Sequence, residues 1–546
     1  MEAAGEYAEP RFFVCAYAHI KIFLFRYARP CDMIVNGGLT LRMRETGMNR
    51  KQKLFLNGGM GLLKQIVAMI CGFLLPRFML EYYGSEVNGL VSSITHFLSL
   101  ISLMEMGIGP VIQANLYTPL AEKNNDQISR IVISSERFFR RIAVIFLIYI
   151  AVLMFVFPTI VNREHNPWFS ASLVAIIAVS TFAQYFFGAT YQLLLNADQK
   201  SYVHIALQII TTALNAVFCI ILIKNGASVH IVKLVTAAIF VVRPLLTALY
   251  VRKHYEINKH IKLTEEPIKQ KWNGFAQHVL AVVCENIDVV VLTLFSTLAS
   301  VSVYSVYFNV ANGLAVTVIM ATTGLESYFG NMIARKENDA LNGSFERVEF
   351  IMHTAVTIVF TIAAITIVPF AAVYTRGIND ADYLLPAFGT LMALAYASRC
   401  LRVPYFSLVK SAGHFKQTQN GAFISTAINA VLSLVLVFKW GLVGVAAGTF
   451  AAMMYHTCYL VWYLHKNIIN RPIWHFVKYV ITDAAVLIIS YFLTKSFIMT
   501  ETTYLSWLLL ACKAAGVTIG TAIVVNLAVN WKTALQTVRR IKGKSA

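Results

Sequence analysis

The strongest constraint on this chain is the recurrence of apolar stretches long enough to cross a membrane. A helix spans a bilayer with roughly 20 mostly apolar residues, and about fourteen such stretches occur along the chain. Only 13% of the 546 residues are charged, which is too few to cover a water-facing surface. The sequence therefore predicts an all-α polytopic membrane protein. The predicted spans lie near residues 54–80, 87–117, 138–160, 169–195, 201–223, 229–250, 272–296, 300–330, 349–374, 383–409, 417–438, 441–464, 473–494 and 504–530.

The charges of the loops support this count of spans. Basic residues follow the even-numbered spans, whereas alternate loops such as EYYGSE, STLAS and GINDAD are short and nearly bare. About twenty-five basic residues fall on one side and about five on the other, the bias that marks cytoplasmic loops. We therefore expect both termini in the cytoplasm. The same bias explains the net charge of +19, and no separate basic stripe with aromatics indicates nucleic acid.

An internal repeat relates the two halves of the chain. YQLLLNADQKSYVHIALQIITTALNAVFCIILI from Tyr191 aligns without a gap with YFSLVKSAGHFKQTQNGAFISTAINAVLSLVLV from Tyr405. The offset is six spans, an even number, so both copies cross the membrane in the same direction. This predicts about 14 transmembrane helices, arranged as two six-helix lobes related by a pseudo-two-fold axis along the membrane normal, plus two accessory C-terminal helices.

These features divide the chain into five predicted parts. An N-terminal extension precedes MNRKQKLF, a short basic leader into the first span, and we expect translation to start at Met48. The parts are the extension 1–47, the N-lobe 48–250, a cytoplasmic linker 251–271, the C-lobe 272–465, and the last two spans with a basic tail, 466–546.

Ionisable residues inside the predicted spans are the candidates for function. Each costs several kcal/mol in lipid unless it faces water or a partner. We therefore expect a polar cavity between the lobes. Two pairs are spaced three residues apart, which places each pair on one helix face. The ionisable residues are Lys64, Arg77, Glu105, Arg243, Glu285, Asp288, Glu326, Arg399, Arg402, Asp483 and Lys513.

Five cations are the candidates for binding a substrate diphosphate: Arg399, Arg402, Lys64, Arg77 and Arg243. Guanidinium groups bind phosphate oxygens two at a time, so a net positive cavity favours an anionic substrate such as a lipid diphosphate. For Arg77 and Arg243, snorkelling toward a span end is the alternative.

Four carboxylates are the candidates for coupling or gating: Glu105, Glu285, Asp288 and Glu326. Glu105 precedes GIGP, where a helix can bend, so it is either a proton-sensitive gate or the partner of a neighbouring arginine. The scattered cysteines form no CxxC pattern, which predicts no metal site. No GxxxxGK[ST] motif occurs, and we expect neither ATP nor another cofactor.

Three stretches carry a resemblance to a known family. They are NGLVSSITHFLSLISLMEMGIGPVIQANLYTPLAEKN (Asn88 to Asn124), LNADQKSY, and GLVGVAAGT (Gly441 to Thr449). They resemble the polysaccharide flippases of the multidrug/oligosaccharidyl-lipid/polysaccharide exporter superfamily, over Met48 to about residue 530. The resemblance implies fourteen helices in two lobes, and flipping of an undecaprenyl-diphosphate-linked oligosaccharide by alternating access.

The resemblance also implies partners and roles. The polyprenyl tail would stay in membrane lipid, and the chain would work beside polysaccharide polymerase or export machinery. The family's use of ionisable cavity residues carries over here to Arg399, Arg402, Lys64 and Glu105.

Other functions remain open at this point. The closest alternative is a cation-coupled multidrug exporter of the same superfamily, which the arginine-rich cavity disfavours. A lipid II flippase is a further alternative, although the clustered early-span arginines expected of one are not found. A membrane glycosyltransferase or polymerase would need a long external loop, which the predicted topology lacks, so we expect no enzyme. A scaffold in an exopolysaccharide complex is also open.

Overall fold

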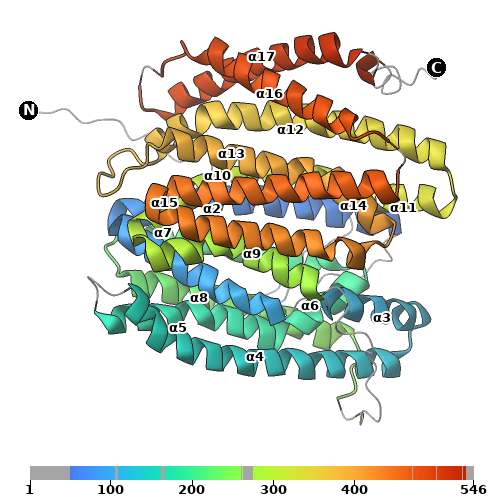
Figure 1. Ribbon diagram of the computed structural model, residues 1–546. Helices are drawn as coiled ribbons and strands as arrows, with labels where there is room; N and C mark the ends of the chain where they lie inside the picture. Colours follow the sequence, from blue (N-terminus) through green and yellow to red (C-terminus); the bar gives the residue numbers. More distant parts are fainter. Residues whose placement is uncertain are drawn as a thin grey trace, which may run out of the picture. The chain divides into compact units, whose positions relative to one another are not determined.

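The computed structural model describes most of the chain as helix (Figure 1). The described residues are 50–104, 108–161, 166–259, 261, 275–469, 471–499, 501–531 and 533–535. Among them there is no strand, which confirms the predicted all-α class. The chain divides into two compact units, Met1–Gly59 and Met60–Ala546. The expected extension 1–47 and most of the linker 251–271 lie outside the described residues, as does Glu105.

The helices have the following bounds. They are α2 (Arg50–Ser99), α3 (Ile108–Glu122), α4 (Asn125–Val161), α5 (Pro167–Ala183), α6 (Ala189–Ala197), α7 (Ser201–Lys224), α8 (Val229–His254), α9 (Phe275–Phe295), α10 (Leu298–Ala321), α11 (Leu325–Ala334), α12 (Asn338–Tyr374), α13 (Pro386–Leu401), α14 (Val403–Ser411), α15 (Phe415–Asn467), α16 (Trp474–Thr494) and α17 (Tyr504–Val529). Two short segments lie between them, the 3-10 turn η1 (Leu100–Met104) and the π-helical η2 (Gln184–Gly188).

Ten helical stretches of the described chain are long and apolar enough to cross a membrane. Two of them, Phe55–Ser102 and Phe415–Asn467, contain a sharp turn at a glycine, and each therefore holds two of the predicted spans. Gly84 (φ 80°) and Gly441 (φ 55°) make these turns, because only glycine adopts a positive φ at little cost. The two remaining predicted spans are α9 and the pair α13–α14.

The fourth and tenth predicted spans are both interrupted before their ends. The fourth runs through α5 and α6 and contains the π-helical η2, an irregularity often found at functional sites. The tenth breaks at Arg402, between α13 and α14. The interruptions fall in corresponding members of the two halves predicted from the repeat.

Each half of the chain is packed around a buried apolar cluster of its own. The first joins side chains of α2 to α8, with residues such as Leu194, Phe146 and Val251. The second joins α9, α10, α12, α13 and α15 around Tyr307 and Phe388. α7 packs on α8 and α5 on α8, whereas α15 packs on both α9 and α13. The accessory helices α16 and α17 pack against α12.

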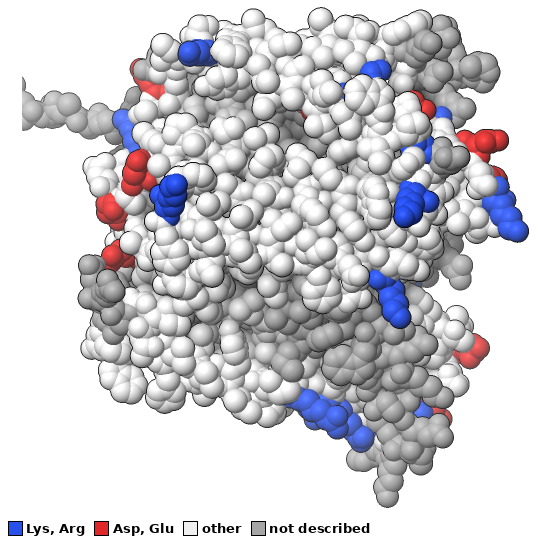
Figure 2. Space-filling view, in the orientation of Figure 1, with Lys and Arg blue, Asp and Glu red and all other residues white. Residues whose placement is uncertain are grey.

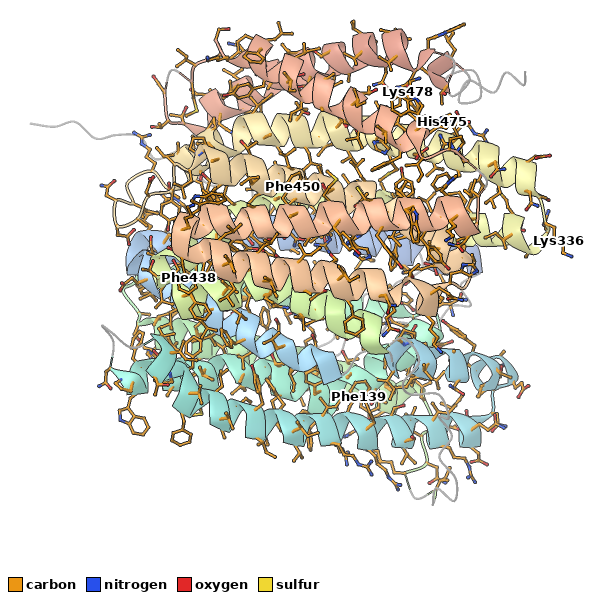
Figure 3. All side chains as sticks on the ribbon, in the orientation of Figure 1. Phe139, Lys336, Phe438, Phe450, His475 and Lys478 are labelled. Atoms are coloured by element: carbon orange, nitrogen blue, oxygen red, sulfur yellow. The ribbon has the colours of Figure 1, made fainter. Side chains whose placement is uncertain are left out.

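The outer surface is that of a membrane protein. Long apolar side chains such as Phe155 and Leu505 are exposed on α4 and α17. Figure 2 shows most charged side chains toward two opposite ends of the helices, with a broad uncharged band between them. In Figure 3, Lys336 at the turn after α11 and Phe438 near the bend of α15 lie at opposite ends. Loops of the two predicted kinds thus lie at opposite ends of the helices.

Candidate functional site: a cationic pocket between α2, α7 and α8

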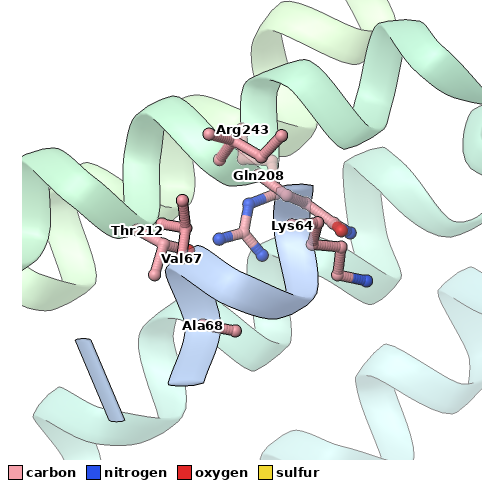
Figure 4. Close-up of a pocket in the computed structure, with 7 residues that line it drawn as sticks. Lys64, Val67, Ala68, Gln208, Thr212 and Arg243 are labelled. Carbon is pink, nitrogen blue, oxygen red and sulfur yellow. The ribbon is translucent and has the colours of Figure 1, made fainter. Parts of the chain in front are cut away.

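The site is built from one face of each of three helices. Lys64, Val67 and Ala68 are spaced three and four residues apart, which places them on one face of the first half of α2. His204, Gln208 and Thr212 follow each other at the same helical spacing on α7. Side chains from α2 and α7 meet Arg243 of α8 in a pocket of about 160 Å³ (Figure 4). We call this the cationic pocket; its lining residues are Lys64, Val67, Ala68, Gln208, Ile209, Thr212 and Arg243.

The cationic pocket holds two positive charges without a described counter-charge. The guanidinium of Arg243 donates from Nε and Nη2 to the hydroxyl of Thr211, at 3.2 and 3.1 Å, and lies 4.9 Å from the ring centre of Phe240. Lys64 forms no hydrogen bond or ion pair with any residue that the structure describes. Lys64 is exposed and Arg243 is half-buried, and a cation within a membrane span is costly unless water or an anion solvates it. The pocket is therefore suited to a ligand with negative charge.

Two uncharged polar groups beside these cations also lack partners. Oε1 of Gln208 and Nδ1 of His204 are buried without a hydrogen-bond partner in the described part of the chain. His204 is only 6% exposed, one helical turn before Gln208. Sequence reasoning missed both residues, because neither is charged at neutral pH. Their signal was the helical spacing that gives them one face of α7.

A set of hydrogen bonds joins the two halves at one end of the molecule. The backbone N–H and the hydroxyl of Ser85 donate to the carboxylate of Asp380 at 2.7 and 2.6 Å. The hydroxyl of Tyr383 lies 2.6 Å from that of Ser85, and Asn88 donates to Ser302 at 2.8 Å. We call these five residues the inter-lobe clasp.

Close packing of helices accompanies the clasp. A Cβ on Gly89 would lie 1.8 Å from the carbonyl oxygen of Leu298, so only glycine allows this approach. Further along α2, Ser93 bonds Thr293 at 2.8 Å, and Ser99 donates to Asn286 of α9 at 2.7 Å. In the predicted topology this closed end is the extracytoplasmic one.

The predicted arginine pair of α13 reaches two different neighbours. Arg399 forms an ion pair with Glu285 of α9 at 2.8 Å and donates to Asn312 at 3.2 Å. Arg402, at the break before α14, donates to Nδ1 of His456 at 2.7 Å. The charge of Arg399 is thus compensated, unlike the charges in the cationic pocket.

Asp288 lies inside the second half, apart from Glu285. It is 3% exposed and accepts hydrogen bonds from Tyr304 (2.9 Å), Asn429 (3.2 Å) and Thr449 (2.7 Å). The side-chain oxygen of Asn429 in turn accepts from Ser433 at 3.1 Å and from Thr449 at 3.3 Å, which extends the network. A buried carboxylate among neutral oxygens can hold a proton or a small hard cation.

Two further predicted residues, Arg77 and Glu326, belong neither to the cationic pocket nor to the inter-lobe clasp. Arg77 donates to the carbonyl of Arg376 at 2.9 Å and lies 3.7 Å from Glu81. Glu326 is half-exposed and lies 3.7 Å from Lys410.

The accessory helix α16 reaches the second half through its own carboxylate. Asp483 lies 2.6 Å from Nδ1 of His353 and accepts from Thr357 at 2.6 Å. This charge therefore anchors α16 to α12.

Both halves carry a tyrosine–glutamate pair at the end of the interrupted span. Tyr191 donates to Glu136 at 2.5 Å, and Tyr405 donates to Glu349 at 2.5 Å. These are the two tyrosines that open the sequence repeat. Glu349 also forms an ion pair with Arg471. Burial opposes the charge of Arg471, but the attraction of Glu349 outweighs it and raises the pKa of Arg471.

Known structures with the same architecture are transporters. No family model matches the sequence, and no curated protein matches it. The chain is similar to the lipid II flippase MurJ in an inward closed conformation, with a TM-score of 0.60 and 15% identity over 87% of this chain and 98% of that one. It is also similar to an inward-facing multidrug resistance MATE family transporter of the MOP superfamily, with a TM-score of 0.57 and 13% identity over 73% and 96%.

A third similar structure is a mutant of the Vibrio cholerae MATE transporter VcmN, with a TM-score of 0.54 and 14% identity over 78% of this chain and 98% of that one. At these identities the likeness establishes the fold. The chain has the fold of these MOP-type transporters.

Proposed function

We propose that this chain is a flippase that moves an undecaprenyl-diphosphate-linked oligosaccharide across a bacterial inner membrane by alternating access. The observation that carries the proposal is the cationic pocket, where Lys64 and Arg243 lie together with no carboxylate among the lining residues described. A diphosphate supplies the negative charge that these side chains lack. Planar guanidinium donors and a mobile ammonium can bind its oxygens together.

The lining of the cationic pocket argues against the main alternative. An exporter of organic cations needs carboxylates or aromatic faces where its substrate binds. The pocket has two cations instead, and none of its described lining residues is acidic or aromatic. The neighbours named MATE transporters share the fold, but this lining favours an anionic substrate.

The inter-lobe clasp supports alternating access. With this end closed by Ser85 and Asp380, the substrate head group would enter from the opposite, cytoplasmic end. Opening toward the outside requires the hydrogen bonds of the clasp to break and Gly89 to part from Leu298. The polyprenyl tail would remain in lipid throughout.

We assign the coupling role to Asp288. Its three hydrogen-bond donors come from α10 and from both parts of α15, so a change in its charge acts on all of them. Loading of a proton or a small cation at Asp288 would change how these helices pack, and a gradient of that ion would bias the transport cycle. The alternative of a coupling role for Glu285 is weaker, because Arg399 already pairs with it.

The proposal also includes location and partners. Both termini would lie in the cytoplasm, and a polysaccharide polymerase would take the product at the outer face. No cofactor is part of this mechanism.

The first test is the double substitution Lys64→Gln and Arg243→Gln in the purified chain, probed with inorganic pyrophosphate. We expect roughly 100-fold weaker binding, because two charge-assisted contacts are lost. Lys253→Gln is the matched control, since Lys253 is an exposed cation on the same helix α8. Unchanged pyrophosphate affinity in the double variant would refute the role of the cationic pocket.

The test in cells separates the two candidate functions. Deletion of the gene should abolish the surface polysaccharide and leave undecaprenyl-diphosphate oligosaccharide on the cytoplasmic face. The double variant should fail to restore export at a normal protein level, whereas Lys253→Gln should restore it. Normal polysaccharide with new sensitivity to organic cations would assign the chain to drug export.

A further inference from the structure

A second cavity lies within the first half, between α2, α5 and α8. Its volume is about 340 Å³, within the range of small-molecule sites. We call it the Lys233 cavity, after the one charged side chain among its described lining residues. They are Thr95, Leu98, Ser99, Ile101, Ser102, Ile177, Ser180, Thr181, Tyr185, Lys233, Thr236, Ala237 and Phe240.

Lys233 has no counter-charge in the described part of the chain. It forms no hydrogen bond or ion pair with any residue there, although its side chain lines the cavity. An ammonium at this depth needs an anion or water around it. Lys233 lies four residues after the start of α8, and its side chain is directed into the cavity.

Three hydroxyl groups that line the cavity, those of Thr95, Ser102 and Thr236, already donate their hydrogens to backbone carbonyls. Thr95 donates to the carbonyl of Val91 at 2.7 Å, and Thr236 donates to that of Val232 at 3.0 Å. Ser102 donates to the carbonyl of Ser99 at 2.7 Å. These oxygens can therefore only accept hydrogen bonds from a ligand without breaking a bond in the helix.

This lining limits the kind of anion that fits. A halide or a fully ionised inorganic anion has no hydrogens to donate to the hydroxyl oxygens. A ligand with several hydroxyl groups and one negative group satisfies both the acceptors and Lys233. A sugar that carries a carboxylate has this combination.

The Lys233 cavity adjoins the cationic pocket through one aromatic side chain. Phe240 lines the cavity, and the guanidinium of Arg243 lies 4.9 Å from its ring centre. Lys233 and Arg243 are ten residues apart on α8, or about 15 Å along the helix axis. That separation is of the size expected between a diphosphate and a nearby sugar of one extended head group.

We infer that the Lys233 cavity binds an acidic sugar of the transported oligosaccharide. The carboxylate pairs with Lys233, the sugar hydroxyls donate to Thr95 and Thr236, and the ring lies against Phe240. This inference rests on the proposed function, because the sugar belongs to the same substrate whose diphosphate binds the cationic pocket.

The experiment measures binding of four probes to the purified chain: glucuronate, glucose, chloride and inorganic pyrophosphate. We expect glucuronate to bind more tightly than glucose. Lys233→Gln should weaken glucuronate binding roughly tenfold, while Lys253→Gln leaves it unchanged. Pyrophosphate binding should stay unchanged in Lys233→Gln, which separates this inference from the proposed function.

A second variant keeps the inference testable if Lys233→Gln folds poorly. Thr236→Val conserves shape but removes an acceptor, and we expect it to weaken glucuronate binding a few-fold. Three results would overturn the inference: equal affinity for glucose and glucuronate, chloride competing as well as glucuronate, or glucuronate binding that is the same in Lys233→Gln. If the wild-type chain does not bind pyrophosphate at all, that result would count against the proposed function alone.

Discussion

The two halves predicted from the sequence repeat use their charges in opposite ways. In the first half, Lys64, Arg243 and Lys233 line cavities without a described carboxylate partner. In the second half, Arg399 pairs with Glu285, and the carboxylate of Asp288 is fully hydrogen-bonded. The sequence repeat between the two halves therefore does not extend to their polar chemistry.

The difference suggests a division of labour. Uncompensated cations lower the stability of the free protein, and binding of an anion restores that stability. Paired charges stabilise their own helices and need no ligand. We therefore expect the first half to hold the substrate and the second half to set the conformational equilibrium.

The largest expected difference between the two halves is in how substitutions change the free energy of unfolding. Glu349→Gln leaves Arg471 buried without its ion pair and should lower the free energy of unfolding by about 3 kcal/mol. Lys64→Gln removes an unpaired cation and should leave the stability unchanged or raise it. Denaturant or thermal unfolding in detergent measures both variants.

One result would contradict this difference in stability between the two variants. If Lys64→Gln destabilises the chain as much as Glu349→Gln, the cations of the first half are structural. The division between a binding half and a structural half would then be wrong.

The sequence predicted the spans well because apolar length and loop charge are local properties. It also singled out Lys64 and Arg243 one by one. Their meeting depends on how α2 packs against α7 and α8, and spacing within one helix carries no information on that packing. Lys233 and His204 were missed for different reasons, since one lies near a helix end and the other is neutral at physiological pH.

The same limit applies to the pairs spaced three residues apart. Spacing predicts that Glu285 and Asp288 share a helix face, but not which neighbours that face meets. Glu285 is half-exposed beside Arg399, whereas Asp288 is buried among α10 and α15. The partner of each charge is a long-range property of the fold.

A medium effect is expected for the ion pair of the second half. Arg399→Ala and Arg402→Ala together should reduce export at an unchanged protein level. A double-mutant cycle of Arg399→Ala and Glu285→Ala should give a coupling energy of about 1 kcal/mol, because Glu285 is half-exposed and screened by water. Full export by the arginine double variant would confine the substrate path to the first half.

An effect of similar size on free energy is expected at the inter-lobe clasp. Ser85→Ala removes the hydroxyl that donates to Asp380 and contacts Tyr383, a loss of about 1 kcal/mol from the closed state. The outward-open population should then rise roughly fivefold, since the open state does not use these bonds. Labelling of an introduced cysteine from the outer face measures that population. Ser93→Ala is a second test variant further along the same helix, and loss of its contact with Thr293 should change opening in the same direction. If neither variant changes the labelling, these hydrogen bonds persist in both states, and the two halves move as one body at this end.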